Sequence, residues 1–209
     1  MDAALQRRLT TAAGRDAVTP PATVTPRDRA HAVAVVNVCA EDNVRFRVRS
    51  SRDGGVTAPD GGIVLSLERL AAVELHAEAL TLRAEAGAPL DVVRATCAAA
   101  GLSVVGLGAD AGSAGTLVAR GAVPRRSLTG VEALLPTGEV VASGGAVLKD
   151  VVGYDLPAVL LGSMGRLAVI VAVTFRLEPQ HAVTPVAPPP GASAPGLLVR
   201  AFDPRGLLQ

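Results

Sequence analysis

Aromatic side chains are nearly missing from this sequence: its 209 residues include three Phe, one Tyr and no Trp. Proteins that bind single-stranded nucleic acids stack the bases on aromatic rings, so the composition argues against that class. The charge balance points the same way, because 20 basic residues are matched by 19 acidic ones and the formal net charge is only +1. We therefore expect neither a nucleic acid nor an anionic membrane surface as a partner.

Long apolar runs are missing too. The stretch from Leu167 to Phe175 near the C-terminus is too short to cross a bilayer, which takes about 20 residues. No transmembrane segment is expected, and residues 1–15 lack the apolar stretch of a signal peptide. The only two cysteines, Cys39 and Cys97, lie in Ala/Val-rich segments, and we expect both to be buried, reduced thiols. Together these features predict a cytoplasmic protein.

Several catalytic and metal-binding motifs are absent as well. The sequence has no CxxC pair, no HExxH and no P-loop, and its three histidines have no partner at metal-ligand spacing. No metal site is therefore predicted. Ser163 lies in Gly-Ser-Met-Gly, which is not the GxSxG elbow of a hydrolase. His31, on the first predicted helix, is interpreted as a surface or helix-packing residue, so the catalytic residues stay unknown.

Hydrophobic residues make up 49% of the chain and charged residues 19%, a composition that favours a folded core. Both ends of the chain are rich in proline, with Pro20-Pro21 near the start and a run at residues 188–190. We interpret residues 1–22 as a disordered or extended N-terminal tail and residues 180–209 as a Pro-rich C-terminal tail. The folded domain is then expected over residues 23–179.

Hydrophobic periodicity divides this domain into short helices and strands. Thr25 is expected to cap the first helix, with Pro26 at its first helical position. Residues 128–135 and 139–142 flank a Pro-Thr-Gly turn and predict a β-hairpin. The remaining predicted elements are strands over 46–48, 63–67, 80–86, 102–107 and 167–177 and helices over 89–100 and 156–161. Because strands outnumber helices and alternate irregularly with them, the predicted fold class is α+β.

Four glycine-rich loops, each after a predicted strand, are the strongest candidates for a ligand site. They include residues 49–55, 106–116, 144–156 and 162–165. Glycine has no Cβ, so such loops let backbone N–H groups come close to a phosphate or a flavin ring. The ordinary alternative is that these glycines only form turns. If they bind a ligand, three loops, residues 49–55, 106–116 and 162–170, should converge on one cleft between two lobes, residues 23–70 and 71–179.

The order of motifs after residue 130 resembles a known family. Leu135-Pro136-Thr137-Gly138-Glu139 is followed by Gly144-Gly145, by the run from Lys149 to Leu156, and by Gly162-Ser163-Met164-Gly165. This series resembles the FAD-binding domain of the vanillyl-alcohol-oxidase/PCMH flavoprotein family, most of all the FAD-binding subunit of the glycolate oxidase type. The resemblance covers residues 23–179 and implies a two-lobed PCMH-type domain without a cap domain.

The resemblance also implies a cofactor and its binding residues. The cofactor is FAD, held non-covalently because the first loop has no histidine to link it. The first loop is expected at the pyrophosphate, and the later loops along the isoalloxazine and adenine. The implied cofactor-binding residues are Arg49, Ser50, Ser51, Arg52, Asp53, Gly54, Gly108, Ala109, Asp110, Gly112, Ser113, Gly115, Thr116, Lys149, Gly153, Tyr154, Gly165, Val169 and Ile170. Lys149 could face an anionic group or solvent, and Tyr154 is interpreted as a core residue.

Departures from the family pattern leave two functions open. The first loop has its glycines late and carries Asp53, which would repel phosphate unless an arginine offsets it. The first hypothesis is a flavin-dependent oxidoreductase acting on 2-hydroxy acids, of the glycolate oxidase type, whose substrate oxidation needs a partner subunit. The alternative is a non-catalytic assembly subunit that keeps the fold and has lost FAD.

Overall fold

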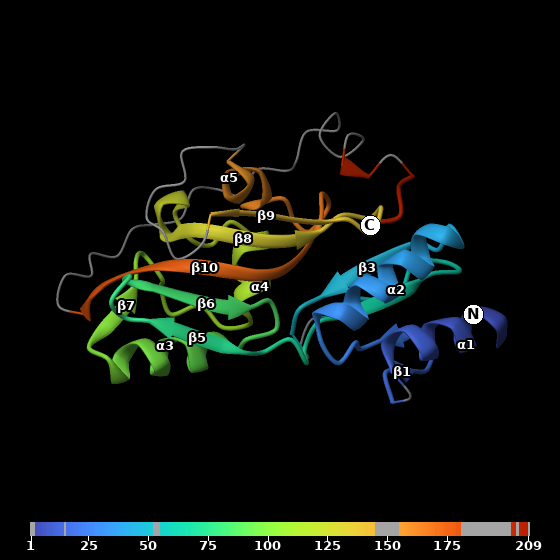
Figure 1. The fold of residues 1–209 in the computed structure, drawn as a ribbon, viewed down its shortest axis with the longest axis horizontal. Coiled ribbons are helices and arrows are strands. Elements are labelled where there is room, and N and C mark those ends of the chain that lie inside the picture. Colours follow the sequence, from blue (N-terminus) through green and yellow to red (C-terminus); the bar gives the residue numbers. More distant parts are fainter. Residues whose placement is uncertain are drawn as a thin grey trace.

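A computed structural model describes residues 3–14, 16–51, 55–144, 155–180, 202–203 and 205–208 of the chain. These residues contain two β-sheets, one mostly parallel and the other antiparallel, and each sheet forms the centre of one lobe (Figure 1). The boundary falls between residues 66 and 73, after the last strand of the first sheet. The predicted α+β class and the division into two lobes are confirmed.

The first lobe contains a small, mostly parallel sheet and two helices. Its elements are α1 (Ala3–Ala13), β1 (Val18–Thr19), β2 (Thr23–Val24), α2 (Arg29–Glu41), β3 (Phe46–Arg49) and β4 (Ile63–Ser66). The strand order is β1-β2-β4-β3, in which β2 and β3 both run parallel to β4. All four residues of β4 are buried because it lies between two neighbours, and the continuous apolar run of this strand is typical of a parallel sheet.

The second lobe is built on an antiparallel sheet. Its elements are β5 (Val73–His76), β6 (Thr81–Glu85), α3 (Leu90–Ala99), β7 (Leu102–Val104), α4 (Ala114–Ala119), the 3₁₀ helix η1 (Arg125–Ser127), β8 (Leu128–Leu134), β9 (Val140–Gly144), α5 (Leu156–Leu160) and β10 (Val169–Pro179). The strand order is β5-β6-β10-β8-β9, and β7 pairs with the end of β10. The long β10 runs through the middle of the sheet (Figure 1).

Apolar side chains of one lobe pack against those of the other. The core of the second lobe joins Val173 and Phe175 of β10 to buried residues of α3, α4 and α5. Val169 and Val171, on the same strand, belong instead to the core of the first lobe, together with Phe46 of β3. Strand β10 therefore packs against both lobes. Its four side chains named here are two residues apart and would share one face of a regular strand, but a register shift between Ile170 and Ala172 changes the face that the later residues present.

The N-terminal region differs from its prediction. Residues 3–13 form helix α1 rather than a disordered or extended tail, and its Leu9 is buried in the core of the first lobe. The sequence pattern hid this helix because only Leu9 and Ala13 are buried along it. Helix α2 also starts later than expected: Asp28, not Thr25, is the N-cap, and its carboxylate accepts a hydrogen bond from the backbone N–H of His31 at 2.9 Å.

The C-terminal region also contributes to the first lobe where the structure describes it. Leu207 and Leu208 are buried in the core of that lobe. The backbone N–H of Phe46 donates a hydrogen bond to the carbonyl of Leu207 at 2.6 Å. Most of the predicted C-terminal tail, residues 181–201, lies outside the described residues.

Both cysteines are buried and carry free thiols, as expected. Burial raises the pKa of Cys39 to about 12 and that of Cys97 to about 11. A thiol with such a pKa forms little thiolate near neutral pH, so both side chains act as small apolar core residues.

A cluster of ion pairs also joins the two lobes. Glu132 of β8 accepts hydrogen bonds at 2.7 Å from Arg29 of α2 and at 2.7 Å from Arg83 of β6. The hydrogen bond from Arg83, and then the charges of Arg83 and Arg29, hold the pKa of Glu132 below its ordinary value. Glu132 and Arg83 are mostly shielded from solvent, so this cluster is less screened than a surface ion pair.

Glu132→Gln is expected to lower the free energy of unfolding at neutral pH by about 1–2 kcal/mol, since it removes charge from hydrogen bonds to two arginines. The pKa of Glu132 is lower in the folded protein, so its contribution is present above about pH 4.3, where an unfolded glutamate titrates, and is lost as the pH falls further. Urea unfolding between about pH 3 and pH 7 measures this. Glu78→Gln, at an exposed turn, should leave the pH dependence unchanged; an equal effect of both changes would contradict the prediction.

Candidate functional site

The main cleft of the described structure lies where three chain segments meet at the boundary of the lobes. Its first half has a volume of about 390 Å³, and its second half one of about 610 Å³. The two halves adjoin each other, because Ser51, Ala111 and Gly112 line both of them. Each half lies within the range of about 300–1,000 Å³ that is usual for small-molecule sites.

The first wall comes from the carboxyl ends of β3 and β4. Because these strands are parallel, the residues that follow them reach the same edge of the sheet. Arg49 donates a hydrogen bond from Nη2 to the hydroxyl of Ser66 at 3.3 Å. Its Nε is buried and has no hydrogen-bond partner among the described residues. A buried cationic donor without an acceptor is costly, so this position is suited to an anionic ligand group.

The second wall is helix α4, in the segment that the sequence indicated only as a loop. Ser113 is its N-cap, and its hydroxyl accepts from the N–H of Thr116 at 3.4 Å. The N–H of Gly115 donates to the carbonyl of Ala86 at 2.9 Å. A Cβ on Gly115 would lie 2.8 Å from the Cβ of Ala86 and 3.1 Å from Oγ of Ser50. Only glycine lets the helix approach both the end of β6 and the first wall so closely.

The third wall is the turn that leads into β10. It is tied to the end of α4 by two backbone hydrogen bonds, from Gly162 to Val118 at 3.0 Å and from Met164 to Ala119 at 2.8 Å. Met164 has a φ of +56° and is 58% exposed. A bulky residue in the left-handed region is rare, and here it places the thioether side chain on the lining of the first half of the cleft.

The described part of each of the three predicted loops contributes to this cleft. The first half is lined by seven of the predicted residues: Arg49, Ser50, Ser51, Gly112, Thr116, Gly165 and Ile170. The second half is lined by five: Ser51, Ala109, Asp110, Gly112 and Ser113. Three predicted residues, Gly108, Gly115 and Val169, line neither half. Val169 has its side chain in the core of the first lobe, because it points to the opposite face of β10 from its neighbour Ile170, which lines the cleft. Six others lie outside the described residues: Arg52, Asp53, Gly54, Lys149, Gly153 and Tyr154.

Several lining residues were not predicted from the sequence. In the second half these include Glu68, Arg69, Asp91 and Arg94. In the first half, Arg120 at the C-terminal end of α4 is the main charged one. Glu68 and Arg69 could have been found, because they follow β4 in the way that the first loop follows β3 and therefore reach the same edge.

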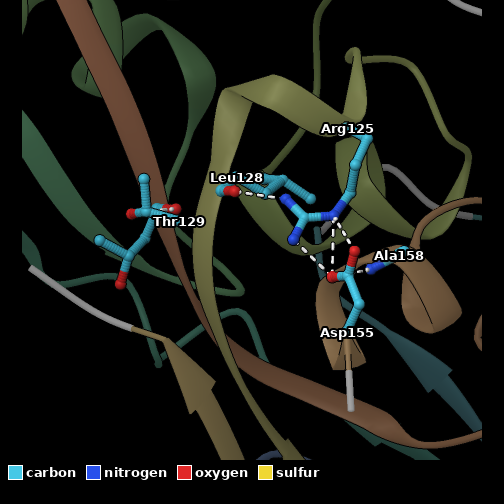
Figure 2. Close-up of polar contacts among 6 residues, drawn as sticks. Arg125, Leu128, Thr129, Asp155 and Ala158 are labelled. Carbon is cyan, nitrogen blue, oxygen red and sulfur yellow. Dashed lines mark hydrogen bonds and ion pairs between the residues drawn. The ribbon is translucent and has the colours of Figure 1, made fainter. Parts of the chain in front are cut away.

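Asp155, near the end of the run from Lys149 to Leu156, has a structural role (Figure 2). It is the N-cap of α5 and accepts from the N–H of Ala158 at 3.1 Å. Arg125 of η1 donates to both of its carboxylate oxygens, from Nε at 2.9 and 3.0 Å, and also donates to the carbonyl of Leu128. The hydrogen bonds from Arg125 hold the pKa of Asp155 below its ordinary value. This contact fastens α5 to the start of β8.

Asp155→Ala is expected to lower the free energy of unfolding by about 1–2 kcal/mol, mostly through loss of the helix cap. The ion pair with Arg125 adds little, because both side chains are more than a third exposed. Asp155→Asn keeps a capping oxygen and should recover most of this loss. Urea unfolding of the two variants is the measurement; if both variants lose the same stability, the ion pair rather than the cap is the main contribution.

The histidines that the structure describes lie away from the cleft lining. His31, on the first turn of α2, contacts Asp28 through Nδ1 at 2.7 Å, which agrees with its interpretation as a surface residue. His76 is exposed on the edge strand β5. Among the described residues, no group of three or more His, Cys, Asp or Glu side chains is placed to hold a metal ion. None of the described helices is long and apolar enough to span a bilayer.

Comparison with protein families decides the identity of this cleft. A family model described as an FAD binding domain matches residues 20–144, which is more than half of the chain. The chain belongs to this FAD-binding domain family. The matched region contains the first wall, the loop before α4 and α4 itself, so the family match includes most of the described cleft.

Individual relatives that the chain matches are named as an oxidase subunit and as dehydrogenases. The chain is 28% identical over 176 residues to glycolate oxidase subunit GlcD of Bacillus subtilis, covering 77% of this chain and 37% of that protein. It is 30% identical over 167 residues to D-2-hydroxyglutarate dehydrogenase of Xanthomonas citri pv. viticola, covering 74% and 34%. The chain therefore spans about a third of the length of these relatives.

Solved structures support the fold. Berberine bridge enzyme from Eschscholzia californica superposes with a TM-score of 0.62 at 16% identity, covering 84% of this chain and 37% of that one. An alkyldihydroxyacetonephosphate synthase superposes with a TM-score of 0.59 at 17% identity, covering 75% and 34%. These values show a shared fold, and the resemblance to the vanillyl-alcohol-oxidase/PCMH FAD-binding domain is confirmed.

The residues of the cleft fit FAD. The buried, unpartnered Nε of Arg49 is suited to a phosphate oxygen. The lining of the first half is mostly small or aliphatic, with Ala111, Gly112, Ala168 and Ile170, which suits the apolar faces of aromatic ring systems. The two adjoining halves also suit an elongated ligand that extends over both of them.

Proposed function

We propose that this chain is the FAD-binding part of a flavin-dependent oxidoreductase that acts on 2-hydroxy acids, of the glycolate oxidase type. The observation that carries the proposal is the two-part cleft with the buried donor of Arg49 at its edge. The substrate class comes from the names of relatives, which include a glycolate oxidase subunit and dehydrogenases of D-2-hydroxyglutarate and D-lactate.

In this proposal, each wall of the cleft has a separate task. Arg49, Ser50 and Ser51 hold the pyrophosphate of FAD, and the backbone around residues 108–116 and 165–170 holds its ring systems. When bound, the flavin supplies the redox chemistry, as the acceptor of a hydride from the substrate. The chain itself binds and orients the cofactor and limits the access of water to it. The cofactor is proposed to be held non-covalently, since the sequence of the first loop, residues 49–55, has no histidine to link it.

Substrate oxidation is proposed to need a further polypeptide. Proton removal from a 2-hydroxy acid needs a base within hydrogen-bond reach of the substrate hydroxyl. The described residues that line the cleft include carboxylates and arginines but no histidine. The relative that is named as a subunit also favours a complex. We place this complex in the cytoplasm, on the sequence grounds given above.

Reconstitution with FAD tests the proposal. The purified chain is expected to bind FAD, to show flavin absorbance bands and to release intact flavin on acid precipitation. Arg49→Gln should weaken FAD binding by about tenfold or more, since a hydrogen bond to a charged group contributes about 1.5–3 kcal/mol. Arg45→Gln is the matched control, because Arg45 lies four residues earlier and donates to the carbonyl of Asp60 rather than lining the cleft. Failure of the wild-type chain to bind FAD would favour the non-catalytic assembly subunit.

The need for a partner has its own test. The FAD-loaded chain alone is expected to show no useful oxidation of glycolate, D-lactate or D-2-hydroxyglutarate with an artificial electron acceptor. Robust turnover by the chain alone would contradict this expectation and would mean that a base lies within the chain.

A further inference from the structure

Arg94 of helix α3 holds the loop that the two halves of the cleft share. Its Nε and Nη2 donate to the carbonyl of Gly108 at 3.2 and 2.8 Å, and Nη2 also donates to the carbonyl of Asp110. One guanidinium group thus binds two carbonyls that lie two residues apart. A planar guanidinium can do this because its donors form a rigid fork, which the single nitrogen of lysine does not provide.

This loop has reasons to move if nothing holds it. It contains Gly108 and Gly112, and Gly112 has a φ of +110°. Glycine adopts this backbone conformation easily, but it can also adopt many other conformations. Backbone hydrogen bonds anchor the loop at its two ends, from Leu107 to Val104 and from Leu90 to Gly112. The contacts of Arg94 lie between these anchors. They therefore fix the middle of the loop, whose backbone would otherwise lose conformational freedom when a ligand orders it.

The position of the loop matters for both halves of the cleft. Ala111 and Gly112 line the first and the second half, and Ala109 and Asp110 line the second. Arg94 itself lines the second half, next to Asp91 on the same helix. A shift of residues 108–112 would therefore change the wall that faces either end of an elongated ligand.

We propose that Arg94 is a positioning residue for the cofactor: it holds residues 108–110 by their carbonyls, so that the shared wall of the cleft is ordered before FAD binds. This rests on the proposed function, because FAD is the ligand whose binding is affected. A wall that is already ordered strengthens binding, since the ligand does not have to order it. The loop on its own was predicted from the sequence, but the residue that holds it was not.

Three variants test this inference. Arg94→Ala removes all of the contacts to the loop, and Arg94→Lys keeps the charge but can reach fewer carbonyls. Arg205→Ala is the matched control: Arg205 also donates to a backbone carbonyl, that of Ala40 at 2.7 Å, but on the first lobe and not on the cleft. The measurements are the Kd of FAD by fluorescence titration, urea unfolding of the FAD-free protein, and amide hydrogen exchange of residues 106–112.

We expect Arg94→Ala to raise the Kd of FAD by about tenfold or more, with Arg94→Lys between Arg94→Ala and the wild type. Amide exchange of residues 106–112 should become faster in the FAD-free Arg94→Ala protein, while its unfolding free energy stays close to that of Arg205→Ala. Unchanged FAD affinity would overturn the inference. The inference would also be overturned if the unfolding free energy of Arg94→Ala fell enough to account for its whole loss of FAD affinity. If the wild-type chain binds no FAD, the proposed function fails, whereas unchanged exchange in residues 106–112 refutes the role of Arg94 by itself.

Discussion

Gly115→Val is expected to weaken FAD binding by at least about tenfold and to lower the free energy of unfolding by about 1–3 kcal/mol, the usual cost of overpacking. The cause is steric. Even the first atom of a side chain at this position would meet Ala86 at 2.8 Å and Ser50 at 3.1 Å. Neither contact can be relieved without moving α4 away from β6 or moving Ser50 out of the first wall. Either movement separates two of the three walls of the cleft.

Ala77→Val is the control for this experiment. Ala77 is exposed in the turn between β5 and β6 and lines neither half of the cleft. This variant should bind FAD like the wild type, and its stability should change by no more than about 0.5 kcal/mol. Fluorescence titration with FAD and urea unfolding give the two readouts. Normal FAD affinity in Gly115→Val would show that the close approach of α4 is not needed for the cofactor.

Phe175→Ala is expected to lower the free energy of unfolding by about 3–5 kcal/mol, the range found when a buried Phe is truncated. Phe175 has no exposed surface and lies in the middle of the second lobe. Its strand, β10, pairs there with Leu82 of β6 and with Leu128 of β8. The cavity left by the ring cannot be filled easily, because the neighbouring strands are fixed by their hydrogen bonds on both sides.

Denaturant unfolding of Phe175→Ala measures this loss directly. Val140→Ala on the edge strand β9 serves as the control, since Val140 is 40% exposed, and it should change stability by no more than about 0.5 kcal/mol. FAD affinity of the folded Phe175→Ala protein should remain near that of the wild type, because Phe175 does not line the cleft. A loss below about 1 kcal/mol would mean that the second lobe repacks around the cavity.

The sequence predicted those elements whose own pattern is strong. The β8–β9 hairpin has a Pro-Thr-Gly turn between two apolar strands, and β10 has a long run of β-branched residues. Helix α3 ends at Gly101, whose φ is +68°, as a helix-terminating glycine requires. For each of these, local conformational preference and burial favour the same structure, so no distant contact is needed to choose between alternatives.

The elements that were missed depend on distant contacts. Helix α1 has too few apolar positions to be recognised and is stabilised by packing of Leu9 into the core of the first lobe. Helix α4 has only six residues and contains Gly115, so its helical preference is low. It is held by hydrogen bonds from Gly115 to Ala86 and from Met164 to Ala119, and these partners are far from it in the sequence.

The sequence by itself determined that this chain has an α+β domain with glycine-rich loops at strand ends, and its motif order indicated an FAD-binding family. Only the tertiary structure decided which loop residues share a wall. It placed Val169 in the core rather than in the cleft, and it brought Glu68 and Arg69 to the second half of the cleft. The physical reason is that a residue's own sequence neighbours set its backbone preference, whereas strand register and the packing of one lobe on the other set the direction of its side chain.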